Sequence, residues 1–461
     1  MQVTPVIAIF DAGKTNKKLF LFDENYRIVY EKSARFIETV DEDGFPCENL
    51  ESLRLSVFDS LSEIFRLKQF KVMAVNFSTY GASFVYVDEN GRPLTPLYNY
   101  LKEYPDHLSK YLYDTYGGES QFAADTASPV LGSLNSGLQL FRLKNEQPEK
   151  FAQLKYALHL PQYLSFLLSG SYYSDITSIG CHTALWNFDD NDYHQWIKKE
   201  GIAPKLAQLK DTEEVLNAIF PGNDYKVGIG LHDSSAALIP YLVSFSEPFI
   251  LISTGTWCIS MNPFNQSPLT GDELKDDCLC YLQYQGKPVK ASRLFAGYEH
   301  EQHVKRIAEH FGTDVIRFRS IPYDPQVIGK LQHHIPQSKA SDPLQKESIF
   351  KTRDLHIFEN ETEAYHQLML DIMHQQVHST NLVLQGTAVK RIFVDGGFSK
   401  NAVYMNLLSA VFPGVEVFAA SMAQATAIGA ALAIHSSWNT KALPGDIIEL
   451  KHYSPGKAVT V

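Results

Sequence analysis

The sequence predicts an α/β protein made of two related domains, and three observations lead to this prediction. Short apolar strands alternate with helical stretches along the chain of 461 residues. A unit of strand, glycine-containing turn and strand occurs at residues 6–22 and again at 249–261. Between these two units, residues 227–238 have the pattern of a strand, a tight turn and a helix. We expect one repeated unit near the start of each domain, which places the domains at 1–244 and 245–461.

The first half begins with a predicted hairpin, in which the strand Val6–Phe10, a polar turn and the strand Leu19–Phe22 follow one another. Apolar residues at helical spacing then predict an amphipathic helix: Leu53, Val57, Leu61, Ile64 and Phe65. The remaining elements of this half are two further strands, a mainly helical region and a polar loop, predicted at 72–77, 84–87, 133–170 and 174–177.

The stretch 227–238 places an acid beside a predicted helix. Asp233 is expected in the turn, with Ser234 or Ser235 capping the helix that follows. Ligands of open α/β sheets bind at the carboxyl ends of strands. A carboxylate there can accept the proton of a substrate hydroxyl, as phosphoryl transfer to an alcohol requires. From this stretch alone, a capping role for Asp233 is the better interpretation.

The second half repeats the opening unit, with a strand at 249–252, the turn Ser253–Thr256 and a strand at 257–261. Pro240 and the segment 244–248 predict a domain junction before it. Residues 313–359 have poor periodicity and several prolines, so surface elaboration is expected there. Helices are predicted at 361–384, 402–412 and 425–434, and strands at 391–394 and 415–418.

Three glycine-containing turns expose backbone N–H groups that can cradle phosphate oxygens: 11–15, 253–256 and Gly396-Gly397. The first also contains cationic and hydroxyl side chains, and Asp11 could hold a magnesium ion through water. The sequence contains neither the G-x-x-x-x-G-K-[ST] pattern of a P-loop nor a G-x-G-x-x-G fingerprint after a strand.

Composition excludes several classes of function. The chain has 41 basic and 52 acidic residues and a formal net charge of −11, which argues against nucleic acid and anionic membranes as partners. The five cysteines form no disulfide or zinc pattern, so reduced thiols in a cytoplasmic protein are expected. No apolar run approaches the ~20 residues of a membrane span, and no signal peptide is expected. The H-x-x-H spacing of His300 and His303 fits a solvated helix face better than a metal site.

Five motifs in one order resemble the FGGY family of carbohydrate kinases. Asp11–Asn16 and Leu251–Trp257 look like the family's first and second phosphate loops. Asp395–Asn401 is similar to its adenosine segment, and Ala425–Ala431 to the helix that closes its nucleotide pocket. His232-Asp233 resembles its catalytic turn, in the form typical of the fuculokinase and rhamnulokinase branches.

The segment Leu134–Lys144 is similar to the same two branches. The resemblance covers the chain from end to end and implies an actin-like ATPase fold, related to ribonuclease H, with two similar domains and mixed central sheets. ATP and the sugar would meet in an inter-domain cleft. The implied reaction transfers the γ-phosphate of ATP to a sugar hydroxyl with Asp233 as general base. In these branches that hydroxyl is on C1 of a 6-deoxy-ketose such as L-fuculose or L-rhamnulose.

The predicted site residues form three groups. Those expected to bind ATP and its phosphates are Gly13, Lys14, Thr15, Lys17, Thr254, Gly255, Thr256, Gly396, Gly397 and Asn401. Those expected to bind the sugar are Thr79, Tyr80, Gly81, His232 and Asp233. Asp11 is the expected ligand of Mg²⁺. The expected partners are therefore a sugar and ATP, and the oligomeric state, a homodimer included, stays open.

Two departures from the family concern the sugar. Ser78 and Ser83 stand where sugar kinases usually carry acids, and residues 99–103 lack the Asp and Arg of a Trp-x-Asp-x-Arg element. Fewer carboxylates make fewer charge-assisted hydrogen bonds, so we expect a less hydroxylated substrate end. An apolar wall from Tyr80, Phe84 and Tyr100 would suit the methyl group of a 6-deoxy-ketohexose.

Three other functions stay open at this point. The first is a kinase for another ketose or polyol, such as xylulose. The second is a non-catalytic sugar- or nucleotide-binding sensor on the same fold, and the third is an ATPase of the chaperone or cytoskeletal type. The position of Asp233 in its own turn favours a kinase, because a sensor does not need a general base.

Overall fold

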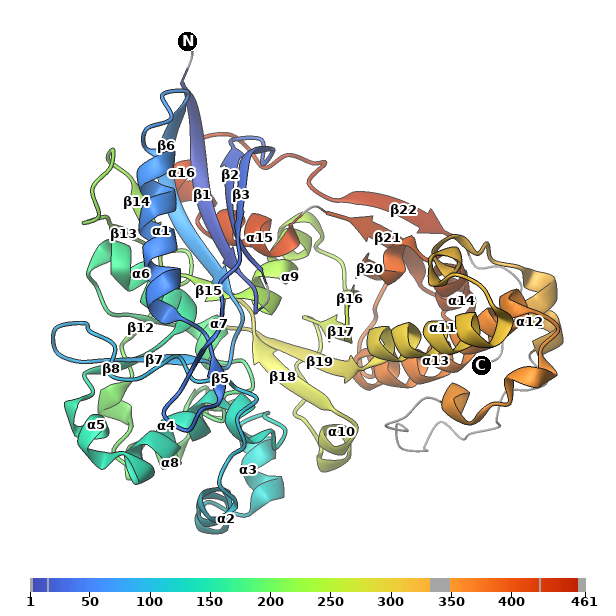
Figure 1. The fold of residues 1–461 in the computed structure, drawn as a ribbon, viewed down its shortest axis with the longest axis horizontal. Coiled ribbons are helices and arrows are strands. Elements are labelled where there is room, and N and C mark those ends of the chain that lie inside the picture. Colours follow the sequence, from blue (N-terminus) through green and yellow to red (C-terminus); the bar gives the residue numbers. More distant parts are fainter. Residues whose placement is uncertain (1–2, 15, 332–348, 423, 455–461) are drawn as a thin grey trace. The chain divides into compact units, whose positions relative to one another are not determined.

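The structure is a computed structural model that describes residues 3–14, 16–331, 349–422 and 424–454. The chain forms two compact units, which we call unit 1 and unit 2 (Figure 1). Unit 1 comprises Met1–Ser244, Cys280–Pro288 and Gln424–Ile447, and unit 2 comprises Phe245–Leu279, Val289–Ala423 and Ile448–Val461. The domain limits predicted from the sequence, 1–244 and 245–461, differ from these units because 280–288 and 424–447 belong to unit 1.

Unit 1 is built on a mixed sheet with the strand order β3–β2–β1–β6–β14–β13. β1 pairs antiparallel with β2 and parallel with β6, and β14 and β15 both run parallel to β6. The strands are β1 Thr4–Ala12, β2 Lys17–Asp23, β3 Ile28–Ala34, β6 Phe70–Thr79, β13 Val215–Asn217, β14 Lys226–Gly228 and β15 Leu231–His232. The residues of β1 from Val6 to Ile9 are fully buried, as expected for a central strand covered on both faces.

The second sheet, most of which belongs to unit 2, repeats this arrangement in the order β18–β19–β17–β16–β20–β21–β22, and Cys280–Leu282 of β18 and Pro288 of β19 are the residues of it that belong to unit 1. β16 pairs antiparallel with β17 and parallel with β20, as β1 does with β2 and β6. The strands are β16 Phe249–Thr254, β17 Cys258–Asn262, β18 Cys278–Leu282, β19 Pro288–Leu294, β20 Arg391–Gly396, β21 Glu416–Ser421 and β22 Glu449–Tyr453. The repeated unit seen in the sequence is therefore the central hairpin of each sheet.

The helices of unit 1 cover its sheet and build a second, smaller core beside it. They are α1 Leu50–Ile64, α2 Asp106–Thr115, α3 Glu119–Asp125, α4 Ser136–Glu146, α5 Pro148–Gln153, α6 Leu160–Ser169, α7 Ile176–Ile179, α8 Gln195–Lys199, α9 Asp233–Ser244, α15 Ala425–Ala433 and α16 His435–Trp438. Short strands pair at its periphery: β4 Thr39–Val40 with β5 Pro46–Cys47, β7 Phe84–Val87 with β8 Tyr156–His159, β9 Ser174–Asp175 with β12 Leu209–Lys210, and β10 Trp186–Asn187 with β11 Asp192–Tyr193.

Unit 2 packs its helices around α13, whose buried residues run from Ala364 to Val383. Its helices are α10 Gly271–Lys275, α11 Ala296–Phe311, α12 Pro325–Leu331, α13 Glu361–Leu384 and α14 Ala402–Val411. Short 3₁₀ turns lie at Val315–Ser320, Ile349–Thr352, Leu355–Ile357 and Phe398–Lys400. The predicted helices at 361–384 and 402–412 are confirmed to within one residue.

One sequence-based expectation is confirmed and another is wrong. Residues 133–170 are mainly helical, as predicted, with the short strand β8 between α5 and α6, where it pairs with β7. Periodicity cannot distinguish so short an apolar strand from a helical segment. The region 313–359 is not mere surface elaboration, since Phe318, Ile328 and Phe350 are buried in the core of unit 2. Isolated apolar residues on 3₁₀ turns carry no periodic signal. Residues 332–348 lie outside the described ranges.

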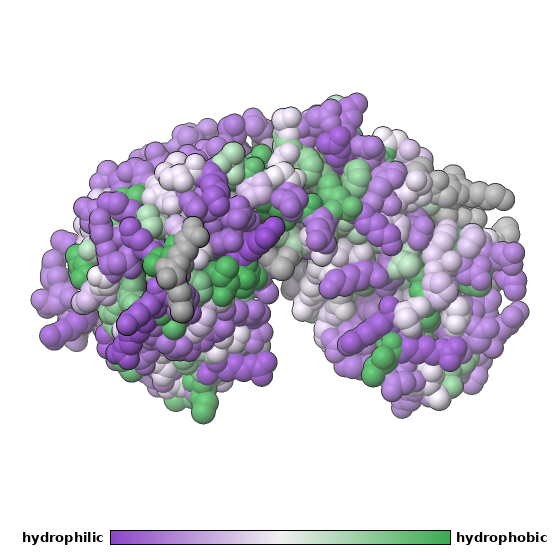
Figure 2. Space-filling model, turned by 90° about the horizontal axis from the view of Figure 1, so that it is seen from above, coloured by the Kyte–Doolittle hydropathy of each residue, from purple (hydrophilic) through white to green (hydrophobic). Residues whose placement is uncertain are grey.

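The surface is polar on the face shown in Figure 2, where hydrophilic residues predominate and hydrophobic residues occur in separate patches. All five cysteines lie in the described ranges, are buried and form no disulfide. Within those same ranges, no helix has the length and apolar character needed to cross a membrane.

Candidate functional site

The stretch 227–238 folds as two short strands and a helix. A turn at Gly230, which has a φ of +84°, separates β14 from β15. β15 pairs with the end of β6, with His232 opposite Thr79. α9 begins directly at Asp233, so the predicted turn is shorter than expected and Ser234 and Ser235 lie in the first helical turn rather than capping it. Asp233 thus stands at the carboxyl edge of the sheet, where ligands bind in open α/β folds.

Asp233 is held in a state suited to proton transfer. Burial raises its pKa from 3.8 to about 6, while hydrogen bonds from Ser234 act in the opposite direction. The imidazole of His232 lies beside it, with Nε2 at 3.3 Å from Asp233 Oδ1. Burial lowers the pKa of His232 to about 4, so this imidazole is neutral at pH 7. Asp233 is therefore a carboxylate at neutral pH that is more basic than an ordinary aspartate.

A second carboxylate, Asp11, ends β1 in the same unit. Its pKa is raised to about 6 by burial and by the negative charge of Asp233, against a hydrogen bond from Thr426. The Thr426 hydroxyl, in the first turn of α15, donates to Asp11 Oδ2 at 2.8 Å. The electrostatic coupling between the two acids shows that β1 and α9 bring Asp11 and Asp233 into one locality.

Aromatic rings and lysines line the turn after β1. The Lys14 ammonium lies 5.6 Å from the ring centre of Tyr80 and 5.7 Å from that of Tyr100. Asp233 helps to raise the pKa of Tyr100, which places this phenol near the candidate base. Lys17 is buried and ion-paired with Glu48, so Lys14 is the lysine of this turn better placed to meet an anion. Thr15 lies outside the described residues.

The predicted sugar-binding residues are placed differently from one another. Gly81 lies against the His232 imidazole, since a Cβ on it would come within 2.8 Å of the ring. Thr79 is fully buried and its hydroxyl donates to the Tyr80 carbonyl. Tyr80 is also buried, and its hydroxyl donates to Glu48. Of this group, Asp233 is the residue whose charge acts on Asp11, and the His232 imidazole lies beside Asp233.

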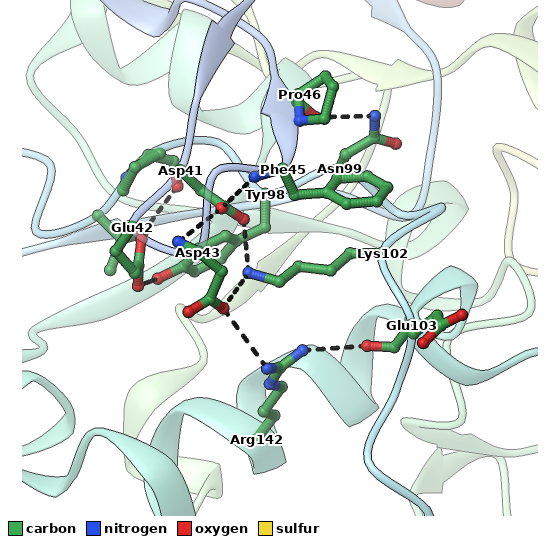
Figure 3. A network of polar contacts seen from close by, with 12 residues as sticks. Asp41, Glu42, Asp43, Phe45, Pro46, Tyr98, Asn99, Lys102, Glu103 and Arg142 are labelled. Atoms are coloured by element: carbon green, nitrogen blue, oxygen red, sulfur yellow. Dashed lines mark hydrogen bonds and ion pairs between the residues drawn. The ribbon is translucent and has the colours of Figure 1, made fainter.

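The region of the altered sugar motif is occupied by an ion-pair network (Figure 3). Lys102 Nζ donates to Asp41 at 2.5 Å and to Asp43 at 2.6 Å, and Arg142 donates to the Glu103 carbonyl at 3.1 Å. Asn99 donates to the Pro46 carbonyl. The side chains of Asn99 and Lys102 thus tie this segment to the loop around β4 and β5. A small solvent-open recess lies beside this network, lined among others by Asp43, Lys102 and Arg142.

The turns of unit 2 differ in how open they are. Thr254 joins two strand ends, because its hydroxyl donates to the Asp395 carbonyl at 2.5 Å and accepts from the Phe398 N–H at 3.0 Å. Gly396 has a φ of +88°, and a Cβ on it would lie 1.9 Å from the Thr254 carbonyl oxygen. Gly397 has an ordinary φ of −63°, and no protein atom lies within 4 Å of where its Cβ would be. The protein itself thus requires glycine at 396 and leaves the space at 397 open.

The other predicted nucleotide residues also lie in unit 2. Gly255 and Thr256 are exposed at the tip of the β16–β17 hairpin. Asn401 caps α14 by accepting the Tyr404 N–H at 3.0 Å and donates to the Tyr365 hydroxyl at 2.6 Å. Gly255, Thr256 and Gly397 are exposed residues, but the backbone N–H of Gly255 donates to the Trp257 carbonyl at 2.8 Å and that of Gly397 to the Thr254 carbonyl at 2.9 Å. The predicted use of these two N–H groups as a phosphate cradle therefore does not fit the structure.

Two family models match this chain. The FGGY family of carbohydrate kinases, N-terminal domain, matches residues 6–239, and carbohydrate kinase FGGY, C-terminal domain, matches residues 246–442. The chain belongs to the FGGY family. The family membership predicted from the five motifs is thereby confirmed.

Curated relatives of this FGGY protein include rhamnulokinases, in keeping with the predicted branch. The rhamnulokinase of Halalkalibacterium halodurans is 24% identical over 268 residues, which are 54% of this chain and 54% of that protein. The rhamnulokinase of Mannheimia succiniciproducens is 20% identical over 435 residues, which are 90% of this chain and 86% of that protein. The match to the H. halodurans enzyme thus spans about half of its length.

Solved structures confirm the predicted fold class of this FGGY protein. A carbohydrate kinase from Novosphingobium aromaticivorans superposes with a TM-score of 0.80 at 23% identity, over 98% of this chain and 95% of that one. A ligand-bound xylulose kinase from Lactobacillus acidophilus gives 0.78 at 16% identity, over 98% and 94% of the two chains. At these identities the likeness establishes the actin-like fold alone.

The residues of this FGGY protein fit a magnesium–nucleotide better than a transition metal. The described part of the chain contains no cluster of three His, Cys, Asp or Glu side chains that could hold a metal ion. Mg²⁺ is usually bound through one or two carboxylates together with waters and substrate phosphates. Asp11, with Asp233 nearby, supplies a donor set of this kind.

Sequence reasoning missed three residues of this locality. Glu48, which holds Lys17 and Tyr80, precedes α1 in a segment without any periodic signal. The charge of Asp233 contributes to raising the pKa of Tyr281, which indicates that Tyr281 lies near Asp233. Thr426 lies in a motif that was identified, but its bond to Asp11 depends on the packing of α15. None of these contacts is visible in a linear pattern.

Proposed function

We propose that this protein is an ATP-dependent sugar kinase that transfers the γ-phosphoryl group of ATP to a hydroxyl of a ketose. The observation that carries the proposal is Asp233 at the carboxyl edge of the unit 1 sheet, with its pKa raised to about 6 and Asp11 in the same locality. Membership of the FGGY family supports the same class of reaction.

In this proposal Asp233 accepts the proton of the sugar hydroxyl as the hydroxyl oxygen attacks phosphorus. Its raised pKa makes it a stronger base than an ordinary aspartate while it stays ionised at neutral pH. The neutral His232 beside it adds no positive charge that would weaken the base. When bound, ATP supplies the phosphoryl group and Mg²⁺ neutralises charge on its phosphates.

We propose that the phosphates and the nucleotide are bound by exposed turns. In unit 1, Gly13 and Lys14 follow Asp11, the proposed ligand of Mg²⁺. In unit 2, Gly255, Thr256, Gly396 and Gly397 form the exposed turns proposed to lie against the nucleotide, and the open space at Gly255 and Gly397 lets a ligand approach the backbone there. The ion pair of Lys17 with Glu48 and the capping role of Asn401 make these two side chains secondary contributors.

A 6-deoxy-ketohexose such as L-fuculose or L-rhamnulose, phosphorylated at the C1 hydroxyl, is the proposed substrate. Ser78 and Ser83 have hydroxyl rather than carboxylate side chains, and both are buried. Phe84 is also buried and stacks on His159, so of the three predicted aromatic residues Tyr100, whose pKa is raised in part by the charge of Asp233, is the better candidate for an apolar wall. The rhamnulokinase relatives point to the same substrate class.

A coupled assay of ADP release over a panel of ketoses and polyols tests this function. We expect kcat/KM for fuculose or rhamnulose to exceed that for xylulose, ribulose or glycerol by roughly ten- to two-hundred-fold, the usual value of one well-housed methyl group. A higher kcat/KM for xylulose or glycerol would contradict the proposed substrate but would leave the proposed kinase activity standing. ADP release with none of the sugars would favour the sensor.

The Asp233→Asn variant tests the role of the base. The amide cannot accept the proton, so we expect kcat to fall by about 10²–10⁴-fold, with ATP affinity in calorimetry unchanged because the nucleotide turns are intact. An Asn variant that keeps the wild-type kcat on the best sugar would remove Asp233 from the mechanism.

A further inference from the structure

The segment 174–177 contacts the turn that bears Asp233. Its prediction as a polar loop is wrong, because it forms β9 and the start of α7, and Asp175 and Thr177 are both fully buried. The Thr177 hydroxyl oxygen accepts the backbone N–H of His232 at 3.0 Å. A side chain from a distant part of the sequence therefore holds the residue immediately before the candidate base.

Asp175 determines the direction of this hydrogen bond. Its Oδ1 accepts both the Thr177 N–H, at 2.9 Å, and the Thr177 hydroxyl, and its Oδ2 accepts the Thr212 hydroxyl. All three partners donate, so Asp175 acts as a carboxylate acceptor. Because the single hydroxyl proton of Thr177 is directed at Asp175, a lone pair of that oxygen is left to face the His232 N–H.

The turn needs such support because its own secondary structure is short. β15 has two residues, and its printed pairing is with Ser78 and Thr79 of β6. On the preceding side, Gln162 donates to the Gly230 carbonyl at 2.7 Å. Thr177 is the contact to the His232 N–H, one peptide before Asp233.

We propose that Asp175 and Thr177 are positioning residues that fix the backbone of His232 and thereby aim the carboxylate of Asp233. This inference rests on the proposed function of Asp233 as the base. A base must lie within hydrogen-bond distance of the hydroxyl it deprotonates, and a displacement of about 1 Å can lower the rate by about a hundredfold. Because Asp175 and Thr177 are fully buried, they act through His232 in this proposal.

Thr177→Val tests this inference, because valine keeps the shape of threonine and removes the acceptor. We expect kcat to fall by about ten- to a hundredfold, with the KM for ATP unchanged. Thr177→Ser keeps the hydroxyl and should restore kcat. If the valine variant does not fold, Thr177→Ala carries the same expectation.

Ser169→Ala is the matched control. The Ser169 hydroxyl is buried at the end of α6, accepts the Ser171 N–H at 3.2 Å and donates to the Ser165 carbonyl at 2.9 Å. Like the Thr177 hydroxyl, it therefore accepts a backbone N–H while it donates to another oxygen. Its loss should lower stability without lowering kcat. An equal loss of kcat in Thr177→Val and Ser169→Ala would show a general structural effect and overturn the proposal.

The Asp233→Asn background separates positioning from stability. If Thr177 acts through Asp233, then Thr177→Val should lower the residual kcat of Asp233→Asn by much less than it lowers the wild-type kcat. The same fold-loss in both backgrounds would contradict the inference.

Amide hydrogen exchange provides a readout that does not depend on activity. The peptide containing His232 should lose protection in Thr177→Val and keep it in Thr177→Ser. Unchanged protection in the valine variant would overturn the inference. Reduced protection in a protein that phosphorylates no sugar would uphold the hydrogen bond and reject the proposed function.

Discussion

At the scale of single residues, the chemistry rests on two carboxylates whose burial makes them basic. Asp11 and Asp233 both have pKa values raised to about 6, and the charge of Asp233 contributes to the shift of Asp11. Paired acids of this kind titrate as a unit. A proton on Asp233 would block its action as a base, so the rate should depend on pH in the range where this pair titrates.

We expect kcat/KM to fall as the pH decreases through about 6, by about tenfold for each further pH unit. The sign follows from the direction of the shift, since a raised pKa makes the carboxyl group protonated, and inactive, at a higher pH than its ordinary 3.8. Rates measured across this range with an acid-tolerant ADP assay test the expectation. A profile that stays flat down to pH values near 4 would contradict it.

The neighbouring glycines of unit 2 lead to a paired prediction. Gly397→Val should weaken ATP binding and leave folding and sugar binding intact, because the protein leaves the space at this position open. Gly396→Ala should instead lower the free energy of unfolding by about 1–3 kcal/mol, since alanine is strained at positive φ. Calorimetry with ATP and thermal melting of both variants distinguish the two effects. Wild-type ATP affinity in Gly397→Val would reject the nucleotide role of this turn.

At the scale of elements, the packing of α15 on α9 holds the site of unit 1 together. α9 carries Asp233 at its start, and α15 carries Thr426, which bonds Asp11. α9 continues through Pro240 to Ser244, although a junction was predicted from Pro240 onward. Pro240 is buried inside α9, where it lacks the N–H that would donate to the preceding turn.

Gly429 in α15 makes the closest approach between the two helices. A Cβ at this position would lie 1.8 Å from the Ala236 carbonyl oxygen. We therefore expect Gly429→Ala to push the helices apart and to cost about 1–3 kcal/mol of stability. Gly414→Ala, where a Cβ meets no atom within 4 Å, is the control and should be near neutral. Equal urea midpoints for the two variants would contradict this account.

At the scale of the whole molecule, the chain does not divide into two units at a single point. Residues 424–447 belong to unit 1 although they follow most of unit 2 in sequence. Within unit 1, Asn76 donates to the Ala430 carbonyl at 2.8 Å, and Tyr26 bonds His435 at 2.6 Å. This late segment therefore completes the core of a unit that begins at the N-terminus.

A fragment of residues 1–244 should consequently fold poorly by itself. It lacks α15, so it would expose the apolar face of α9 that α15 covers. Joining residues 424–447 to its end through a flexible linker should restore a cooperative melting transition. The two fragments can be compared by circular dichroism and size-exclusion chromatography. Cooperative melting of the shorter fragment would show that α15 is dispensable.

Local patterns in the sequence determined the class of fold and the identity of the main turns. The hairpins that begin at Val6 and Phe249, the long helix at 361–384 and the turn with Asp233 all carry strong local signals: apolar runs, helical periodicity or glycine-marked turns. The motifs in those turns were sufficient to identify the FGGY family, because their residues follow one another along the chain.

Tertiary structure decided which residues meet. Thr426 reaches Asp11, and Thr177 holds His232, across 415 and 55 positions of sequence. Glu48 forms an ion pair with Lys17, a residue that the sequence alone suggested as a phosphate ligand. Burial also raised the pKa values of Asp11 and Asp233, and no local pattern encodes burial. The sequence thus determined the turns and their residue types, whereas packing over long separations determined their contacts and their acidity, because both depend on atoms that distant segments bring together.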